Sequence, residues 1–155
     1  MIRRANESDV SAIMALLLQV NMVHHRGRPD LFKGPATKYT EKELRELIKD
    51  DSTPVLVYLD EENRVLAHCF CVFRQEKNSA LMTDVKTLYI DDLCVDENAR
   101  GQGVGQAMYA HVHAFARQSG CYNLTLNVWT LNDPALRFYE KCGLKPQKIG
   151  METIL

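Results

Sequence analysis

The sequence contains no apolar run near the roughly 20 residues needed to cross a bilayer, and no apolar signal segment at its start. Its five cysteines are an odd number, which argues against a secreted disulfide framework. It has little net charge, -1 over 155 residues, so no global field draws it to nucleic acid or acidic membranes. These absences predict a cytoplasmic protein that binds neither nucleic acid nor a membrane.

The chain also lacks internal repeats, low-complexity tracts and a recognisable linker. With 46% hydrophobic and 25% charged residues, its composition is that of an ordinary globular protein. A chain of this length can bury a sizeable core without disulfides or a structural metal. We therefore expect a single domain over residues 1–155.

The first part of the chain predicts a strand, a helix and a loop. Residues Ile2–Arg4 have strand character, and apolar residues then recur at helical spacing over residues 10–17, behind Ser8 or Asn6 as a cap. Residues 24–35 are polar and punctuated by Gly and Pro. We expect a loop there, long enough to contact substrate.

A second helix and an antiparallel meander should follow. Thr40 and Glu43 match the capping-box pattern, in which each side chain bonds the other residue's backbone N–H, and an apolar helical face comes next. Residues 55–59 and 65–73 are rich in strand formers and separated by a polar loop, which predicts a hairpin. A third run over residues 83–95 should continue the sheet.

The second half of the chain predicts a Gly-rich loop, a helix, a strand, a helix and a last β-like stretch. The helix after the loop carries an apolar stripe and stops at residues 119–120, and a strand over 122–128 follows. The last helix should begin with Asp133 as its cap and Pro134 in the first helical position, and Gly143 should end it.

The Gly-rich loop carries the strongest chemical signal. Three glycines stand at alternate positions in the segment Arg100-Gly101-Gln102-Gly103-Val104-Gly105-Gln106. Without Cβ atoms, backbone N–H groups can turn towards an anion, and the positive end of the following helix favours the same charge. The segment has no Lys-Ser/Thr pair, and Gln106 replaces the third glycine of a dinucleotide motif. The loop predicts a pyrophosphate site; a tight turn without a ligand is the alternative.

The spacing Arg100-x-x-Gly103-x-Gly105 matches the Q/R-x-x-G-x-G/A signature of the GNAT family of N-acetyltransferases, which the chain resembles from Ile2 to its C-terminus and most specifically over residues 88–143. The resemblance implies an α/β (α+β) fold. Its mixed, mostly antiparallel central sheet would have six or seven strands and about four flanking helices. The sheet would be splayed between its fourth and fifth strands.

The resemblance also implies acetyl-CoA as cosubstrate. The backbone of Leu93, Cys94 and Val95 would pair with the pantetheine arm like an added strand. Next to the signature residue Arg100, the amides of Gly101, Gln102, Gly103, Val104, Gly105 and Gln106 would hold the pyrophosphate. Asn132 matches a position that contacts the cofactor in many relatives, although locally it is equally a turn residue before a helix.

Two catalytic groups follow from the resemblance, which implies direct attack of an amine on the thioester. Tyr139 matches the general acid near the CoA sulfur, although an apolar stripe on its helix would also make it a core residue. Asp91 or Asp92 matches the base that takes the amine's proton. Strand alternation sends only one of them into a given cleft, and we favour Asp91. In the family a bulge in the fourth strand typically re-aims its groups at the active site, and Asp91-Asp92 lies where such a bulge would fall. Asn127 either contacts cofactor or substrate or faces solvent.

We expect no metal, because His24, His25 and Asp30 lack a recognisable ligand spacing. Cys94 would lie near the cofactor, but direct attack needs no acyl-cysteine. Residues 144–155 are too few for the two final strands of many relatives, so a partner subunit could supply the missing edge, and we expect a homodimer.

The sequence thus predicts an acetyl-CoA-dependent N-acetyltransferase acting on a primary amine, most simply of a small molecule. A protein or peptide N-acetyltransferase, a non-catalytic acyl-CoA sensor and a regulatory nucleotide-binding domain are the alternatives. The acceptor stays open, because the basic residues of the 24–35 stretch favour an anionic acceptor whereas Asp91 and Asp92 favour a polyamine.

Overall fold

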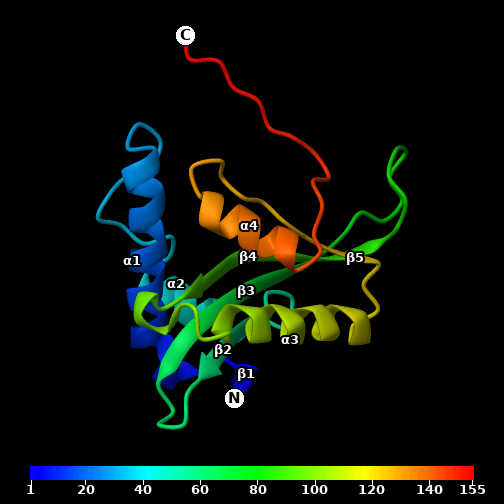
Figure 1. Cartoon of the computed structure of the whole chain (residues 1–155). Helices are drawn as coiled ribbons and strands as arrows, with labels where there is room; N and C mark the ends of the chain where they lie inside the picture. Colours follow the sequence, from blue (N-terminus) through cyan, green and yellow to red (C-terminus); the bar gives the residue numbers. More distant parts are fainter.

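The computed structural model describes every residue from Met1 to Leu155 (Figure 1). The elements follow the chain in the order β1 (Ile2–Arg4), η1 (Glu7–Asp9), α1 (Val10–Gly27), α2 (Glu41–Leu47), β2 (Val55–Leu59), β3 (Val65–Gln75), β4 (Lys86–Val95), η2 (Glu97–Ala99), α3 (Val104–Gln118), β5 (Asn123–Leu126) and α4 (Asp133–Lys141).

A five-stranded sheet forms the centre of the molecule, with its strands in the order β1-β2-β3-β4-β5. The first four strands pair antiparallel, and β5 pairs parallel to β4. The predicted mixed, mostly antiparallel α/β sheet is therefore confirmed.

The prediction of six or seven strands is wrong, because residues 144–155 form no strand. In Figure 1 this segment leads away from the body of the molecule after α4. Its one backbone hydrogen bond runs from Leu144 N to Tyr139 O, at 3.1 Å. Pro146 cannot donate to a sheet ladder and Gly150 weakens an extended run, so the segment lacks the local preference to form a strand by itself.

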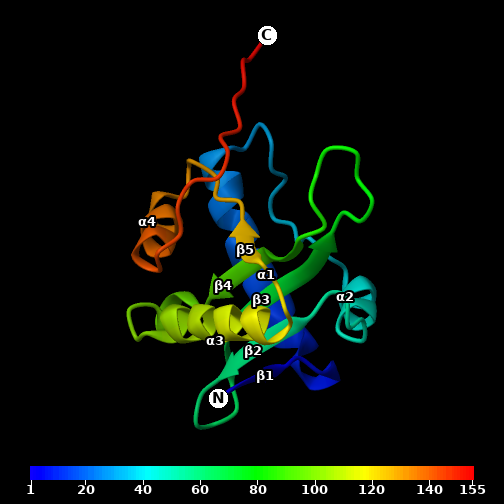
Figure 2. The same cartoon turned by 90° about the vertical axis from the view of Figure 1, so that its right-hand side faces the viewer.

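Side chains of the sheet alternate between two cores. Leu17 of α1 and Leu44 of α2 pack with Val57 and Phe70 on one face. Met108 and other apolar residues of α3 pack with Cys69 on the opposite face. Figure 2 shows α3 crossing one side of the sheet, with α1 behind it. Burial of both faces explains why β2 is almost continuously apolar.

The helix ends follow local chemistry, with two shifts from the predicted boundaries. The helix α1 continues through His24 and His25, which the sequence assigned to a loop, because no residue that breaks a helix precedes Gly27 and basic side chains suit a helix C-terminus. Asn132, and not Asp133, caps α4, since its side chain accepts from the Ala135 N–H at 3.3 Å.

The sheet opens between β4 and β5. The pairing of these strands ends at Ile90 and Leu126, while β4 continues to Val95. From residue 91 onward the outer edge of β4 therefore has no strand beside it, and the chain after β5 diverges towards α4.

Candidate active site

A cavity of about 520 Å³ lies where β4 and β5 separate. Its walls come from α1, the segment before α2, both separating strands and α4. Among the predicted site residues, it brings together Asp91, Asp92, Leu93, Asn132 and Tyr139. Residues far apart in the sequence thus share one pocket of a size suited to a small molecule.

A β-bulge places both adjacent carboxylates in this cavity. On β3, Phe70 lies opposite Asp92 and Cys71 lies opposite Ile90, which leaves Asp91 as the extra residue. Because the bulge interrupts the alternation of side chains, Asp91 and Asp92 both line the cavity. The expectation that only one of them would enter it is wrong for this reason.

Asp91 is held by two donors from the segment that precedes α2. Lys38 Nζ lies 2.5 Å from its Oδ2, and the Tyr39 hydroxyl donates to the same oxygen at 3.1 Å. The Tyr39 ring stacks on Phe70 with a centroid separation of 5.6 Å. Burial and the charge of Asp91 raise the pKa of Tyr39, which keeps the phenol protonated as a donor. Asp91 therefore ties this segment to β4.

The second cavity carboxylate, Asp92, is held by His68 of β3. The two side chains meet at 2.5 Å between His68 Nε2 and Asp92 Oδ2. The His68 ring is fully buried and lies edge-on to Phe70, while its Nδ1 has no hydrogen-bond partner. This pairing of a fully buried histidine with a cavity carboxylate had no signal in the sequence.

Tyr139 reaches the cavity from α4. It is the one buried residue of that helix and is only 9% exposed. Burial first, and then nearby groups including Asp92, raise the pKa of the Tyr139 phenol. The side chain is thus a phenol throughout the neutral pH range, as a proton donor must be.

The loop before α3 presents free backbone donors. None of the six N–H groups from Gly101 to Gln106 donates a hydrogen bond within the chain, and no side chain caps α3. Gly101 and Gly103 adopt φ angles of 75° and 80°, which favour glycine, and a Cβ atom on either would point into open space. Six unpaired donors at the positive end of a 15-residue helix form a site for an anion.

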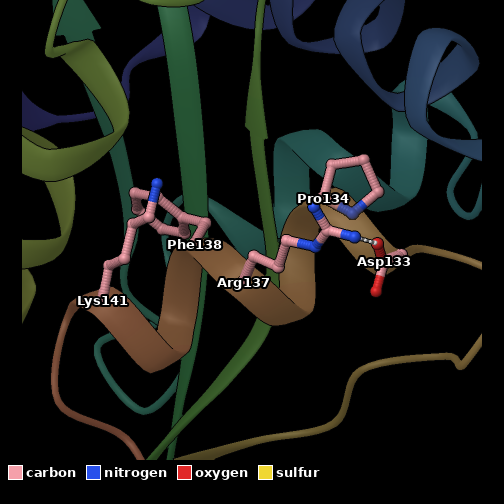
Figure 3. A pocket seen from close by; sticks show the side chains of 5 residues that line it. All are labelled: Asp133, Pro134, Arg137, Phe138 and Lys141. Atoms are coloured by element: carbon pink, nitrogen blue, oxygen red, sulfur yellow. Dashed lines mark ion pairs between the residues drawn. The ribbon is translucent and has the colours of Figure 1, made fainter.

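Gly105 has a different role in this loop. A Cβ atom there would lie 3.4 Å from Val95 Cγ2 and 3.5 Å from the Phe138 ring. Its small size therefore lets the start of α3 approach both β4 and α4. Beside Phe138, Figure 3 shows a shallow hollow along α4 that also carries Arg137 and Lys141.

Gln19 of α1 fixes the end of β4 next to the loop. Its side-chain amide donates to Val95 O at 3.0 Å and to Cys94 Sγ at 3.3 Å, and its oxygen accepts from the Glu97 N–H at 3.1 Å. Burial raises the pKa of the Cys94 thiol to about 12. Cys94 is therefore a buried thiol, and its side chain faces α1.

Aromatic side chains from separate parts of the chain meet in the wall of the cavity. The Phe32 ring lies 4.9 Å from His24 and 5.1 Å from Trp129 between ring centroids. Asn127 also lines the cavity and donates to the Tyr89 hydroxyl at 3.2 Å. Burial lowers the pKa of His24. The expectation that residues of the 24–35 stretch could reach substrate gains support from the positions of His24 and Phe32.

Sequence reasoning missed Gln19, Lys38, Tyr39 and His68. None belongs to a local motif, and each reaches the site through a contact between residues distant in the sequence, such as Gln19 and Val95, which are 76 positions apart. The one available signal was the long polar segment before α2, which predicted a contact with substrate but no particular residue.

No helix is both long and apolar enough to cross a membrane. The structure also brings no three His, Cys, Asp or Glu side chains together in a way that could hold a metal ion.

An unpaired strand edge followed by six free N–H groups is an arrangement that would suit an extended ligand with an anionic group. The sequence model described as the Acetyltransferase (GNAT) family matches residues 21–144. The chain therefore belongs to this family, whose members use acetyl-CoA as the acetyl donor.

Similar proteins agree with this membership. A crystal structure of a mutant BH1408 protein from Bacillus halodurans superposes with a TM-score of 0.96 at 30% identity, over 100% of this chain and 99% of the other. A probable glucosamine 6-phosphate N-acetyltransferase 2 of Oryza sativa subsp. japonica is 33% identical over 91 residues, or 58% of this chain. Glucosamine 6-phosphate N-acetyltransferase 1 of Dictyostelium discoideum is 25% identical over 107 residues, or 69% of this chain. The matches span 51% and 65% of these two curated relatives.

The burial of Cys94 makes a direct prediction about its reactivity. With a pKa of about 12, only about one thiol in 10⁴ is ionised at pH 8, compared with roughly a quarter of free cysteine. Peptide mapping after timed iodoacetamide labelling should show Cys94 reacting at least about 100-fold more slowly than free cysteine. Labelling of Cys94 at the rate of free cysteine would contradict the buried thiol.

Proposed function

We propose that the chain is an acetyl-CoA-dependent N-acetyltransferase, folded as one domain, that acetylates a primary amine of a small molecule. The observation that carries this proposal is the set of six free N–H groups directly beyond the unpaired edge of β4. The edge at Leu93, Cys94 and Val95 would pair with the pantetheine arm, and the loop would hold the pyrophosphate. Arg100 and Lys141 of the nearby hollow supply positive charge for the phosphates, while Arg137 in that hollow pairs with Asp133.

The proposed reaction uses groups that share the cavity. The acceptor's ammonium loses one proton to a carboxylate of the pair Asp91 and Asp92, and the neutral amine attacks the thioester carbonyl. As the C–N bond forms and the C–S bond breaks, the departing thiolate takes the phenol proton of Tyr139. The nitrogen's second proton restores that phenol, so one proton is released overall.

The charges of the cavity favour a cationic acceptor. Asp91 and Asp92 both line it, whereas its basic residues are Lys38, which is paired with Asp91, and His24. Arg28 pairs instead with Asp30 and Glu152 at the surface. We therefore favour an amine carrying further positive charge over a phosphorylated amino sugar such as the one in the relatives' names.

The alternatives make different demands on the site. A non-catalytic acyl-CoA sensor would need the loop but neither Tyr139 nor the two carboxylates. A protein or peptide N-acetyltransferase would need an open groove, whereas the acceptor side here is a cavity that Phe32 and Trp129 help to line.

The five cysteines are all free, which fits the reducing cytoplasm that we propose as the location of the protein.

We also propose a homodimer built on the C-terminal segment. Ile149 and Met151 are 80% and 88% exposed and alternate as in a strand, while the outer edge of β5 has no partner strand. Pairing this segment with β5 of a second copy would satisfy the edge and bury the apolar side chains.

Acetyl-CoA should raise the melting temperature of the protein, whereas ATP and NAD should not. Protection by ATP in place of acetyl-CoA would contradict the proposed cofactor.

Gly103→Ala should weaken acetyl-CoA binding about tenfold or more, because a Cβ atom at φ 80° strains the loop and enters the space in front of its N–H donors. Titration calorimetry measures this affinity. Gly120→Ala is the matched control, with a similar φ of 71° at the other end of α3, and should keep the affinity.

Tyr139→Phe should lower kcat about 10–100-fold, because it removes the proton donor while keeping the ring. The Kd for acetyl-CoA should stay within about a factor of two. Steady-state assays of CoA release, with calorimetry for the Kd, separate the two effects. Unchanged turnover would remove Tyr139 from the mechanism and favour a solvent proton donor.

Light scattering at micromolar concentration should give twice the chain mass of 17.7 kDa. The double substitution Ile149→Asp with Met151→Asp should give a monomer, because two carboxylates cannot be buried against β5. Leu81→Asp, at a position 89% exposed in the β3–β4 connection, is the control and should remain dimeric. A monomer mass for the unaltered protein would refute the dimer.

A further inference from the structure

His68 is the one histidine in the molecule that is fully buried. It lies on β3, beside the cavity residue Asp92, and its Nε2 is 2.5 Å from Asp92 Oδ2. The Nδ1 atom is buried without a partner. Burying a polar ring in an apolar core costs folding free energy unless its nitrogen atoms are hydrogen-bonded. The burial of His68 with one unpaired nitrogen therefore favours a functional role.

The unpaired Nδ1 atom identifies the state of the ring. If Nδ1 carried a proton, a buried N–H group would lack an acceptor, which costs more than an unpaired lone pair on an aromatic nitrogen. The favoured state is therefore the neutral tautomer with its proton on Nε2. That proton is donated to Asp92 Oδ2, and this hydrogen bond is stronger when Asp92 is a carboxylate than when it is a neutral acid.

Both cavity carboxylates leave Oδ1 without a partner, and they differ in the groups that hold Oδ2, which include a lysine cation at Asp91 but only an imidazole at Asp92. Lys38 and Tyr39 both contact Oδ2 of Asp91 and tie it to the segment before α2. Asp92 has a single contact, through Oδ2 to His68, and its side chain is 13% exposed. Its Oδ1 is therefore available to a ligand in the cavity that Tyr139 also lines.

We propose that His68 is a positioning residue, which holds Asp92 as the anionic carboxylate that receives the acceptor's ammonium and takes its proton. Asp91 then anchors the segment around Lys38 and Tyr39 that closes the acceptor side. The inference rests on the proposed function, and it assigns the base to Asp92 and not to the Asp91 favoured by the sequence. In the balanced step, the N–H bond of the ammonium breaks, an O–H bond forms on Asp92 Oδ1, and the Nε2 proton of His68 stays in place.

The test compares two substitutions of the same residue. His68→Leu removes the donor and should lower kcat about 10–100-fold with an unchanged Kd for acetyl-CoA. His68→Gln can place an amide N–H near the former Nε2 position and should recover most of this loss. Thermal melts of both variants show whether each is folded. A folded His68→Leu protein with the kcat of the unaltered enzyme overturns the proposal, as does a folded His68→Gln no more active than His68→Leu.

Substituting each aspartate in turn separates the roles of the two carboxylates. Asp92→Asn should lower kcat, whereas Asp91→Asn should mainly raise the KM for the amine, because it loosens the anchored segment. The opposite pattern would return the base to Asp91 and contradict the inference.

A readout independent of turnover is the imidazole ¹⁵N NMR spectrum of the unaltered protein. We expect the Nε2–H tautomer for His68, and the Nδ1–H tautomer or an imidazolium would overturn the proposal. If the protein binds acetyl-CoA but acetylates no amine, the proposed function fails and the catalytic part of this inference falls with it. The spectrum still decides whether His68 holds Asp92 as described.

Discussion

The separation of β4 from β5 after four paired residues determines the rest of the site. A strand edge in a protein interior must satisfy its N–H and C=O groups, and beyond Ile90 the chain itself offers β4 no neighbouring strand there. An extended ligand can take that place. The edge leads through η2 into the loop before α3, so a ligand paired with β4 would bring its anionic end to the six free N–H groups.

Helix packing and strand pairing hold the polar side chains around this opening. Packing of α1 against the sheet positions Gln19 at the end of β4. The bulge in β4 directs the side chains of Asp91 and Asp92 towards the same cavity. The two acidic groups then have different supports, a surface cation and a phenol for one and a buried imidazole for the other. Adjacent residues with different partners can perform different tasks, because each environment acts on its own carboxylate.

Local chemistry made much of this predictable from the sequence. The Gly-rich loop, the apolar stripe of α3 and the Thr40 capping box depend on neighbouring residues, and the structure has all three. The sequence could not reveal the pairing of His68 with Asp92, which lies 24 residues away and exists only because β3 and β4 are in register. The strand count was wrong for a similar reason, since the β-like residues after Gly143 find no partner within the chain.

The central claim is that the cavity transfers an acetyl group from CoA to a primary amine. The most direct test follows release of the CoA thiol while the purified protein is offered acetyl-CoA with polyamines, amino acids, amino sugars, amino sugar phosphates and peptides in turn. We expect amine-dependent release, strongest with small polycationic amines, and an acetylated product of matching mass. Binding of acetyl-CoA without release of CoA by any amine would contradict it.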